Sequence, residues 1–122
     1  MSMQKSKILV VDDEIKTCEL FAKFLMKQKF NVTTASDGKM ALVRADEFQP
    51  DCLLLDVRMP YGGLGLLSQL REKLPGSPVI MMSAFIEVRQ MADYLNEGAF
   101  ACLQKPIDLN SLLEKIKEAL KI

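Results

Sequence analysis

The sequence predicts an α/β fold in which five strands alternate with five helices and form one parallel sheet. Strand-like and helix-like patterns follow one another along the whole chain of 122 residues. Three of the strand patterns are almost continuously apolar, which is typical of parallel strands covered by helices on both faces. Four strand patterns also end at a polar or charged residue, as expected when a site lies along one edge of the sheet.

The first half of the chain begins with two strand–helix units. The strand pattern Lys7–Val11 precedes a helical pattern over 14–28, and a second strand pattern covers Asn31–Ala35. Ser36 is expected to be the N-cap of the second helix, which Pro50 ends. The apolar faces of these helices are Ile15, Cys18, Ala22 and Leu25, and Ala41, Leu42, Ala45 and Phe48.

The second half repeats this alternation three times. Strand patterns cover Cys52–Leu55, Val79–Met82 and Ala101–Gln104. Asp108 is expected to cap the last helix, and Ile107 to pack onto it as a hydrophobic staple. The three helices are predicted from Leu64, Leu67, Leu70 and Leu74; from Val88, Met91, Ala92 and Leu95; and from Leu109, Leu112, Leu113, Ile116 and Leu120.

The composition is that of one globular domain, which we expect to span residues 1–122 with its core at 7–121. Lys and Arg number 16, as do Asp and Glu, so the balance of charge gives no support for direct binding of nucleic acid. The chain has neither a signal-peptide pattern nor a membrane-length apolar run, and its three cysteines suggest no disulfide framework, so a reducing cytoplasm is expected. It has no histidine, which excludes histidine-based metal sites and catalysis.

The polar residues at the strand ends predict a single site. Asp12 and Asp13 follow the first strand, Asp56 the third, Ser83 the fourth, and Lys105 the fifth. The carboxyl ends of parallel strands lie along one edge of a sheet, so these side chains are expected to converge. Carboxylates, a hydroxyl and an ammonium together suit a divalent cation and a phosphoryl group. Clustered carboxylates also repel, so at least one is expected to have a raised pKa.

Four motifs in this order resemble the receiver domain of bacterial two-component response regulators. They are Val-Val-Asp-Asp-Glu at 10–14, Leu-Leu-Leu-Asp-Val-Arg-Met-Pro at 53–60, Met-Met-Ser-Ala at 81–84 and Lys-Pro at 105–106. The resemblance covers roughly residues 7–121. It implies a flavodoxin-like, doubly wound (βα)5 fold with strand order 2-1-3-4-5.

The resemblance also implies roles for the acidic residues. Asp56 is the nucleophile that becomes an aspartyl phosphate. Asp13 and Asp56 ligate Mg²⁺ (or Mn²⁺) directly, Asp12 acts through water, and the backbone carbonyl of Arg58 is a further ligand.

Other residues are implied to handle the phosphoryl group and the signal. Lys105 neutralises a phosphoryl oxygen, and Ser83 donates its hydroxyl to another after phosphorylation. Ser83 and Phe100 form the switch, in which the rotamer of Phe100 follows Ser83. The peptide bond before Pro106 is a candidate for the cis form. Phosphate lifetime is expected to depend on Arg58 and Phe85.

The expected function is a signalling switch activated by phosphorylation. Such a domain is not an enzyme with an external product, although it catalyses its own phosphorylation and a slow autodephosphorylation. The donor is expected to be a histidine kinase or a histidine phosphotransfer protein, and the receiver of the signal an output domain or a protein target. A homodimer through 85–121 is also expected. The sequence fits both a single-domain regulator and a receiver from a longer protein.

Several alternatives compete with this interpretation. A haloacid-dehalogenase-type phosphohydrolase needs an acid where Arg58 stands, and a flavodoxin needs a Ser/Thr/Gly-rich loop after the first strand. A receiver-like interaction module that works without phosphorylation stays open. Residue by residue, Asp12 or Asp13 can be a helix N-cap, Asp56 can start a turn, and Lys105 can lie in a plain surface turn.

Two further features carry expectations. The loop Tyr61-Gly62-Gly63 is one residue shorter than the family pattern and lacks its acidic residue, which predicts greater flexibility. Methionines are expected to fill the core rather than bind a metal or a partner, namely Met26, Met40, Met81, Met82 and Met91.

Overall fold

Five parallel strands form one sheet in the order β2-β1-β3-β4-β5. The computed structural model describes residues 5–59, 61–84 and 88–122, without the side chains of Val88 and Arg89. The predicted flavodoxin-like α/β fold is therefore confirmed. The strands are β1 (Lys7–Val11), β2 (Asn31–Ala35), β3 (Cys52–Asp56), β4 (Val79–Ser83) and β5 (Ala101–Gln104).

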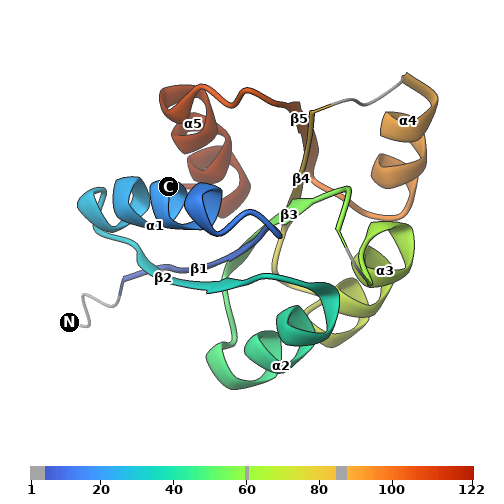
Figure 1. The fold of residues 1–122 in the computed structure, drawn as a ribbon, viewed down its shortest axis with the longest axis horizontal. Coiled ribbons are helices and arrows are strands. Elements are labelled where there is room, and N and C mark those ends of the chain that lie inside the picture. The colour runs from blue at the N-terminus through green and yellow to red at the C-terminus, as the bar shows by residue number, and fades with distance from the viewer. Residues whose placement is uncertain (1–4, 60, 85–87) are drawn as a thin grey trace.

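The helices cover both faces of this sheet (Figure 1). Alternate residues of a strand point to opposite faces, so Ile8 and Val10 pack with α1 and α5, whereas Leu9 and Val11 pack with α2, α3 and α4. This explains why the central strands are apolar throughout. The helices are α1 (Ile15–Lys27), α2 (Gly38–Phe48), α3 (Gly63–Lys73), α4 (Val88–Asn96) and α5 (Leu109–Leu120).

Two strands extend one residue further than the sequence pattern suggested. Asp56 is the last residue of β3 and Ser83 is the last residue of β4. The backbone N–H of Val57 donates to the carbonyl oxygen of Met82 at 2.8 Å, which continues the pairing past Asp56. Both polar residues are consequently held by the sheet itself rather than by a loop.

The N-cap of α2 is Asp37, so the prediction of Ser36 was wrong. The Asp37 carboxylate accepts the backbone N–H of Met40 at 2.8 Å, as an N-cap does three residues into a helix. At the other end Gln49, in a left-handed conformation, closes the helix directly before Pro50. Asp108 caps α5 as predicted and accepts the backbone N–H of Ser111.

Two predicted helix faces are wrong in part. Among the α4 side chains that the structure describes, the buried one is Tyr94, while Ala92 and Leu95 are exposed. In α3 Leu66 is buried and Leu64 is exposed. In both helices the buried stripe differs from the one that apolar spacing suggested, because packing against the neighbouring elements of the core decides which side chains are covered.

Of the five methionines predicted to fill the core, two are buried, two are exposed and Met91 is intermediate. Met81 and Met82 are fully buried in β4, as predicted. Met26 and Met40 are 52% and 38% exposed, so their prediction as core residues was wrong. Both lie at the β2 edge of the sheet, where no further strand follows β2 in the described part of the chain.

The short loop between β3 and α3 packs against the start of α2. A Cβ on Gly38 would lie 1.7 Å from the carbonyl oxygen of Tyr61, so only glycine fits there without a backbone shift. The Lys39 ammonium lies 4.4 Å from the centroid of the Tyr61 ring. The loop thus has specific contacts with α2, which the sequence did not suggest.

Among the helices of the described residues, none combines the length and apolar character needed to cross a membrane.

Candidate functional site

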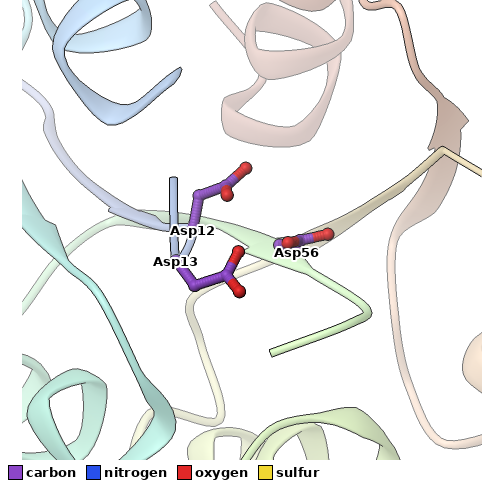
Figure 2. A group of neighbouring side chains, drawn as sticks. All are labelled: Asp12, Asp13 and Asp56. Carbon is purple, nitrogen blue, oxygen red and sulfur yellow. The ribbon is translucent and has the colours of Figure 1, made fainter. Parts of the chain in front are cut away.

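Three aspartates meet at the carboxyl ends of β1 and β3 (Figure 2). Asp12 directly follows β1 and is completely buried, Asp56 ends β3 with 6% of its surface exposed, and Asp13 is exposed. They meet because β1 and β3 are hydrogen-bonded neighbours in register, with Val11 opposite Leu55. One carboxylate oxygen from each lies within 4.8 Å of the other two.

Lys105, directly after the end of β5, contacts this acidic cluster. Its Nζ lies 2.7 Å from Oδ2 of Asp12 and 3.6 Å from Oδ1 of Asp56. The backbone N–H of Lys105 donates to the carbonyl oxygen of Ser83 at 2.6 Å, which fixes the chain after β5 against the end of β4. The peptide bond between Lys105 and Pro106, the cis candidate, is cis.

The electrostatics of the cluster raise the pKa of Asp56. Burial and the neighbouring charge of Asp12 raise the Asp56 pKa to about 6, although Lys105 and the backbone N–H of Arg58 act in the opposite direction. Burial alone would lower the Lys105 pKa, but the hydrogen bond to Asp12 and the nearby carboxylates raise it above its ordinary value. Lys105 is therefore a permanent positive charge, while the acids still repel one another.

The donor set fits a small divalent cation. Mg²⁺ prefers hard oxygen ligands and usually keeps several waters. One carboxylate oxygen from each aspartate lies within 4.8 Å of the other two, so the three carboxylates could hold one such ion, directly or through water. Asp13 is exposed, which gives the site a side open to water. A cation there would also relieve the repulsion that raises the Asp56 pKa.

The other predicted site residues lie at different distances from this cluster. Ser83 is buried at the end of β4, beside β3, with Asp56 opposite Met82 in the register. The Arg58 side chain is exposed, two residues beyond Asp56. Phe100 is 44% exposed just before β5, where its backbone N–H donates to Val79 at 2.7 Å. Phe85 lies outside the described residues.

One supporting contact was not predicted. The Cys18 thiol of α1 donates to the backbone carbonyl of Asp12 at 3.2 Å. The Asp12 carboxylate, in turn, accepts the backbone N–H of Glu14 at 2.9 Å. Glu14, not Asp12 or Asp13, occupies the N-cap position of α1. Helical spacing placed Cys18 on the buried face, but its contact with the chain of Asp12 depends on how α1 packs.

Comparisons with known proteins agree with this geometry. Residues 8–117 match the family model of the response regulator receiver domain. The chain is 34% identical to regulatory protein AtoC of Escherichia coli over 118 residues, covering 96% of this chain and 26% of AtoC. It is 33% identical to the probable transcriptional regulatory protein TcrX of Mycobacterium tuberculosis, covering 97% of this chain and 51% of TcrX. The chain thus spans about a quarter to a half of these relatives.

Solved structures give the same result. A CheY-like receiver domain protein from Methanospirillum hungatei JF-1 superposes with a TM-score of 0.92 at 28% identity, covering 97% of this chain and 95% of that one. The BeF3-activated receiver domain of DrrB superposes with a TM-score of 0.88 at 27% identity, covering 98% and 100%. Family model, fold and acidic cluster agree: this chain belongs to the response regulator receiver domain family.

Proposed function

We propose that this chain is a signalling switch, activated when Asp56 accepts a phosphoryl group. The observation that carries the proposal is the convergence of Asp12, Asp13, Asp56 and Lys105 at one edge of a receiver fold. We further propose that residues 1–122 act as one receiver domain, a phosphoacceptor rather than an enzyme with an external product.

Asp56 is the proposed nucleophile. One of its carboxylate oxygens forms a bond to phosphorus as the bond between phosphorus and the donor's leaving group breaks. These 122 residues contain no histidine, so the donor phosphohistidine lies outside them, in a histidine kinase or a histidine phosphotransfer protein. For that donor the broken bond is the P–N bond, and the electron pair leaves with the imidazole.

The surrounding groups position and stabilise the transferred charge. Lys105 already contacts the Asp56 carboxylate, so its ammonium is close enough to neutralise a phosphoryl oxygen. Asp13, Asp56 and the Arg58 carbonyl are the proposed direct ligands of Mg²⁺ or Mn²⁺, with Asp12 acting through water. When bound, the cation neutralises negative charge between the carboxylates and the phosphoryl group.

The switch is proposed to run from Ser83 to Phe100. A phosphoryl group on Asp56 gains a hydrogen bond from the Ser83 hydroxyl at the neighbouring strand end, which favours one position of that residue. Phe100 is half exposed and can turn inward as Ser83 moves. The altered face around residues 85–121 then binds an output domain, a protein target or a second copy. Arg58 and Phe85 are proposed to set the lifetime of the phosphate.

The test is the intact mass of the protein after incubation with acetyl phosphate, with and without Mg²⁺. The proposal expects the gain of one phosphoryl group only when Mg²⁺ is present, and no gain for Asp56→Asn. If acetyl phosphate fails, the experiment is repeated with a phosphorylated histidine kinase. Absence of phosphorylation in both would show a receiver-like module that works without it.

A further inference from the structure

A groove runs along the β2 edge of the sheet, and the residues that line it do not include the aspartates or the lysine of the acidic cluster. It has a volume of about 460 Å³ and lies over β2, between α1 and α2. Figure 1 shows β2 at this edge, with the two helices on opposite sides of it. The groove is lined mainly by apolar atoms, and its walls include the exposed Met26 and Met40 and the exposed Ile15.

The floor of this groove offers backbone hydrogen-bonding groups. The Asn31 N–H donates to Ser6, and the Ala35 carbonyl accepts from Asp12, so these two residues direct their backbone groups toward β1. Backbone direction alternates along a strand, which places the N–H and C=O groups of Val32 and Thr34 on the outer side. β2 ends the sheet in the described part of the chain, so these outward groups have no neighbouring strand.

The wall from α2 adds a polar group. Arg44 lines the groove, and its Nε is buried without a hydrogen-bond partner among the described residues. Within the described residues its guanidinium makes a long ion pair with Glu47, at 3.7 Å. Because the Nε itself is buried, an occupant of the groove would meet the exposed part of the Arg44 side chain, which is 43% exposed, and its carbonyl or carboxylate oxygens would complement the guanidinium charge.

We propose that this groove binds an extended peptide segment that adds a sixth strand beside β2. An extended segment can pair with the outward groups of Val32 and Thr34, whereas a helix satisfies its backbone groups internally. Alternate apolar side chains of the segment contact the methionines, whose flexible side chains adapt to different shapes. A backbone or side-chain oxygen accepts from Arg44.

The groove favours a single strand over a second copy of the domain. A second copy would bring its own α1 and α2 to the same edge. An isolated strand needs only the space over β2. The acidic residues do not line the groove, although Cys18 and Ala35 of its lining both hydrogen-bond to the backbone of Asp12, and binding does not require the phosphorylation proposed above.

The test uses a panel of acetylated, amidated peptides of about six residues. Each has Val, Ile or Leu at alternate positions and one Asp. Binding to the unphosphorylated protein is followed by amide NMR. The proposal expects slower hydrogen exchange at the Val32 and Thr34 amides, and no change at Thr33, which already pairs with β1. Peptides N-methylated at alternate residues, on the edge facing β2, should not bind.

Matched variants test the walls of the groove. Met26→Lys should weaken binding by about tenfold or more, because it places a charge in an apolar contact. Leu20→Lys is the control, since Leu20 is 54% exposed on the same helix and does not line the groove. Failure of every peptide to bind, or equal binding by the N-methylated forms, would overturn the proposal. Protection of Val32 and Thr34 that rises with protein concentration alone would assign the edge to a second copy instead.

Discussion

Asp56 combines a buried position with two acidic neighbours, and this makes its protonation part of the stability of the protein. Its pKa in the folded state is about 6, above the ordinary value of 3.8. Below about pH 4 the carboxyl is protonated in both the folded and the unfolded state. Between about pH 4 and 6 the unfolded state loses its proton first, so the folded state loses stability as the pH rises.

Asp56→Asn should therefore stabilise the metal-free protein, with a gain that grows from pH 4 to pH 6 and then levels off. We expect about 1–3 kcal/mol at pH 7. Urea unfolding across this pH range, in buffer with a chelator, measures the difference. Asp93→Asn, at an exposed position of α4, is the control. A gain that is the same at pH 4 and pH 7 would contradict the role of ionisation.

Asp12 and Asp13 are adjacent acids in the sequence, and repulsion between clustered carboxylates alone would predict that neutralising either one stabilises the metal-free protein. The structure separates them, because Asp12 is buried against Lys105 at 2.7 Å while Asp13 is exposed. Asp12→Asn should cost about 1–3 kcal/mol, since it leaves Lys105 with a weaker partner. Asp13→Asn should raise stability by up to about 1 kcal/mol. Metal-free unfolding curves of the two variants distinguish these outcomes, and equal effects would show that the ion pair contributes nothing.

At the scale of single elements, the start of α2 depends on one carboxylate. Asp37→Ala should destabilise the protein by about 0.5–2 kcal/mol, because the Met40 N–H loses its acceptor. Ser36→Ala is the matched control and should change stability by less than about 0.5 kcal/mol. Thermal unfolding of the two variants measures the difference. A larger loss of stability for the Ser36 variant would show that Ser36, not Asp37, is the N-cap of α2.

The contact between α2 and the loop after β3 gives a second prediction for an element. Gly38→Ala should cost about 1–3 kcal/mol, because the new Cβ meets the Tyr61 carbonyl and the loop must move. Gly65→Ala, in α3, meets no atom within 4 Å and should add about 0.4–1 kcal/mol. Chemical denaturation of the two variants provides the comparison. A stabilising Gly38→Ala would mean that loop and helix are not in contact.

At the scale of the whole molecule, a cation that binds only the folded cluster should raise the melting temperature. Free Mg²⁺ at ten times its dissociation constant stabilises the fold by about 1.4 kcal/mol, which corresponds to roughly 4–8 °C for a domain of this size. Differential scanning calorimetry over a Mg²⁺ titration measures this, with Asp13→Asn as a variant that should respond less. An unchanged melting temperature at millimolar Mg²⁺ would refute the cation site.

The burial of individual helix side chains was the part of the architecture that the sequence predicted least well. Strand positions followed from apolar runs, and strand order from the family resemblance. The buried faces of α3 and α4 did not follow completely, because a helical stripe such as the leucines at 64–74 is compatible with several orientations until the helix packs against its neighbours. Met26 and Met40 appeared to be core residues for a similar reason, since spacing cannot reveal that β2 lies at an edge.

The sequence by itself determined which residues end the strands of this sheet, and so which side chains gather at its carboxyl edge. That inference holds because parallel strands all present their carboxyl ends on one side, whatever the details of the loops. Only the tertiary structure decided how those side chains pair. Asp12 forms an ion pair with Lys105, Asp56 has a raised pKa and Asp13 is exposed. The sequence could not give these differences, because burial and ion pairing depend on distances of a few ångströms between residues far apart in the chain.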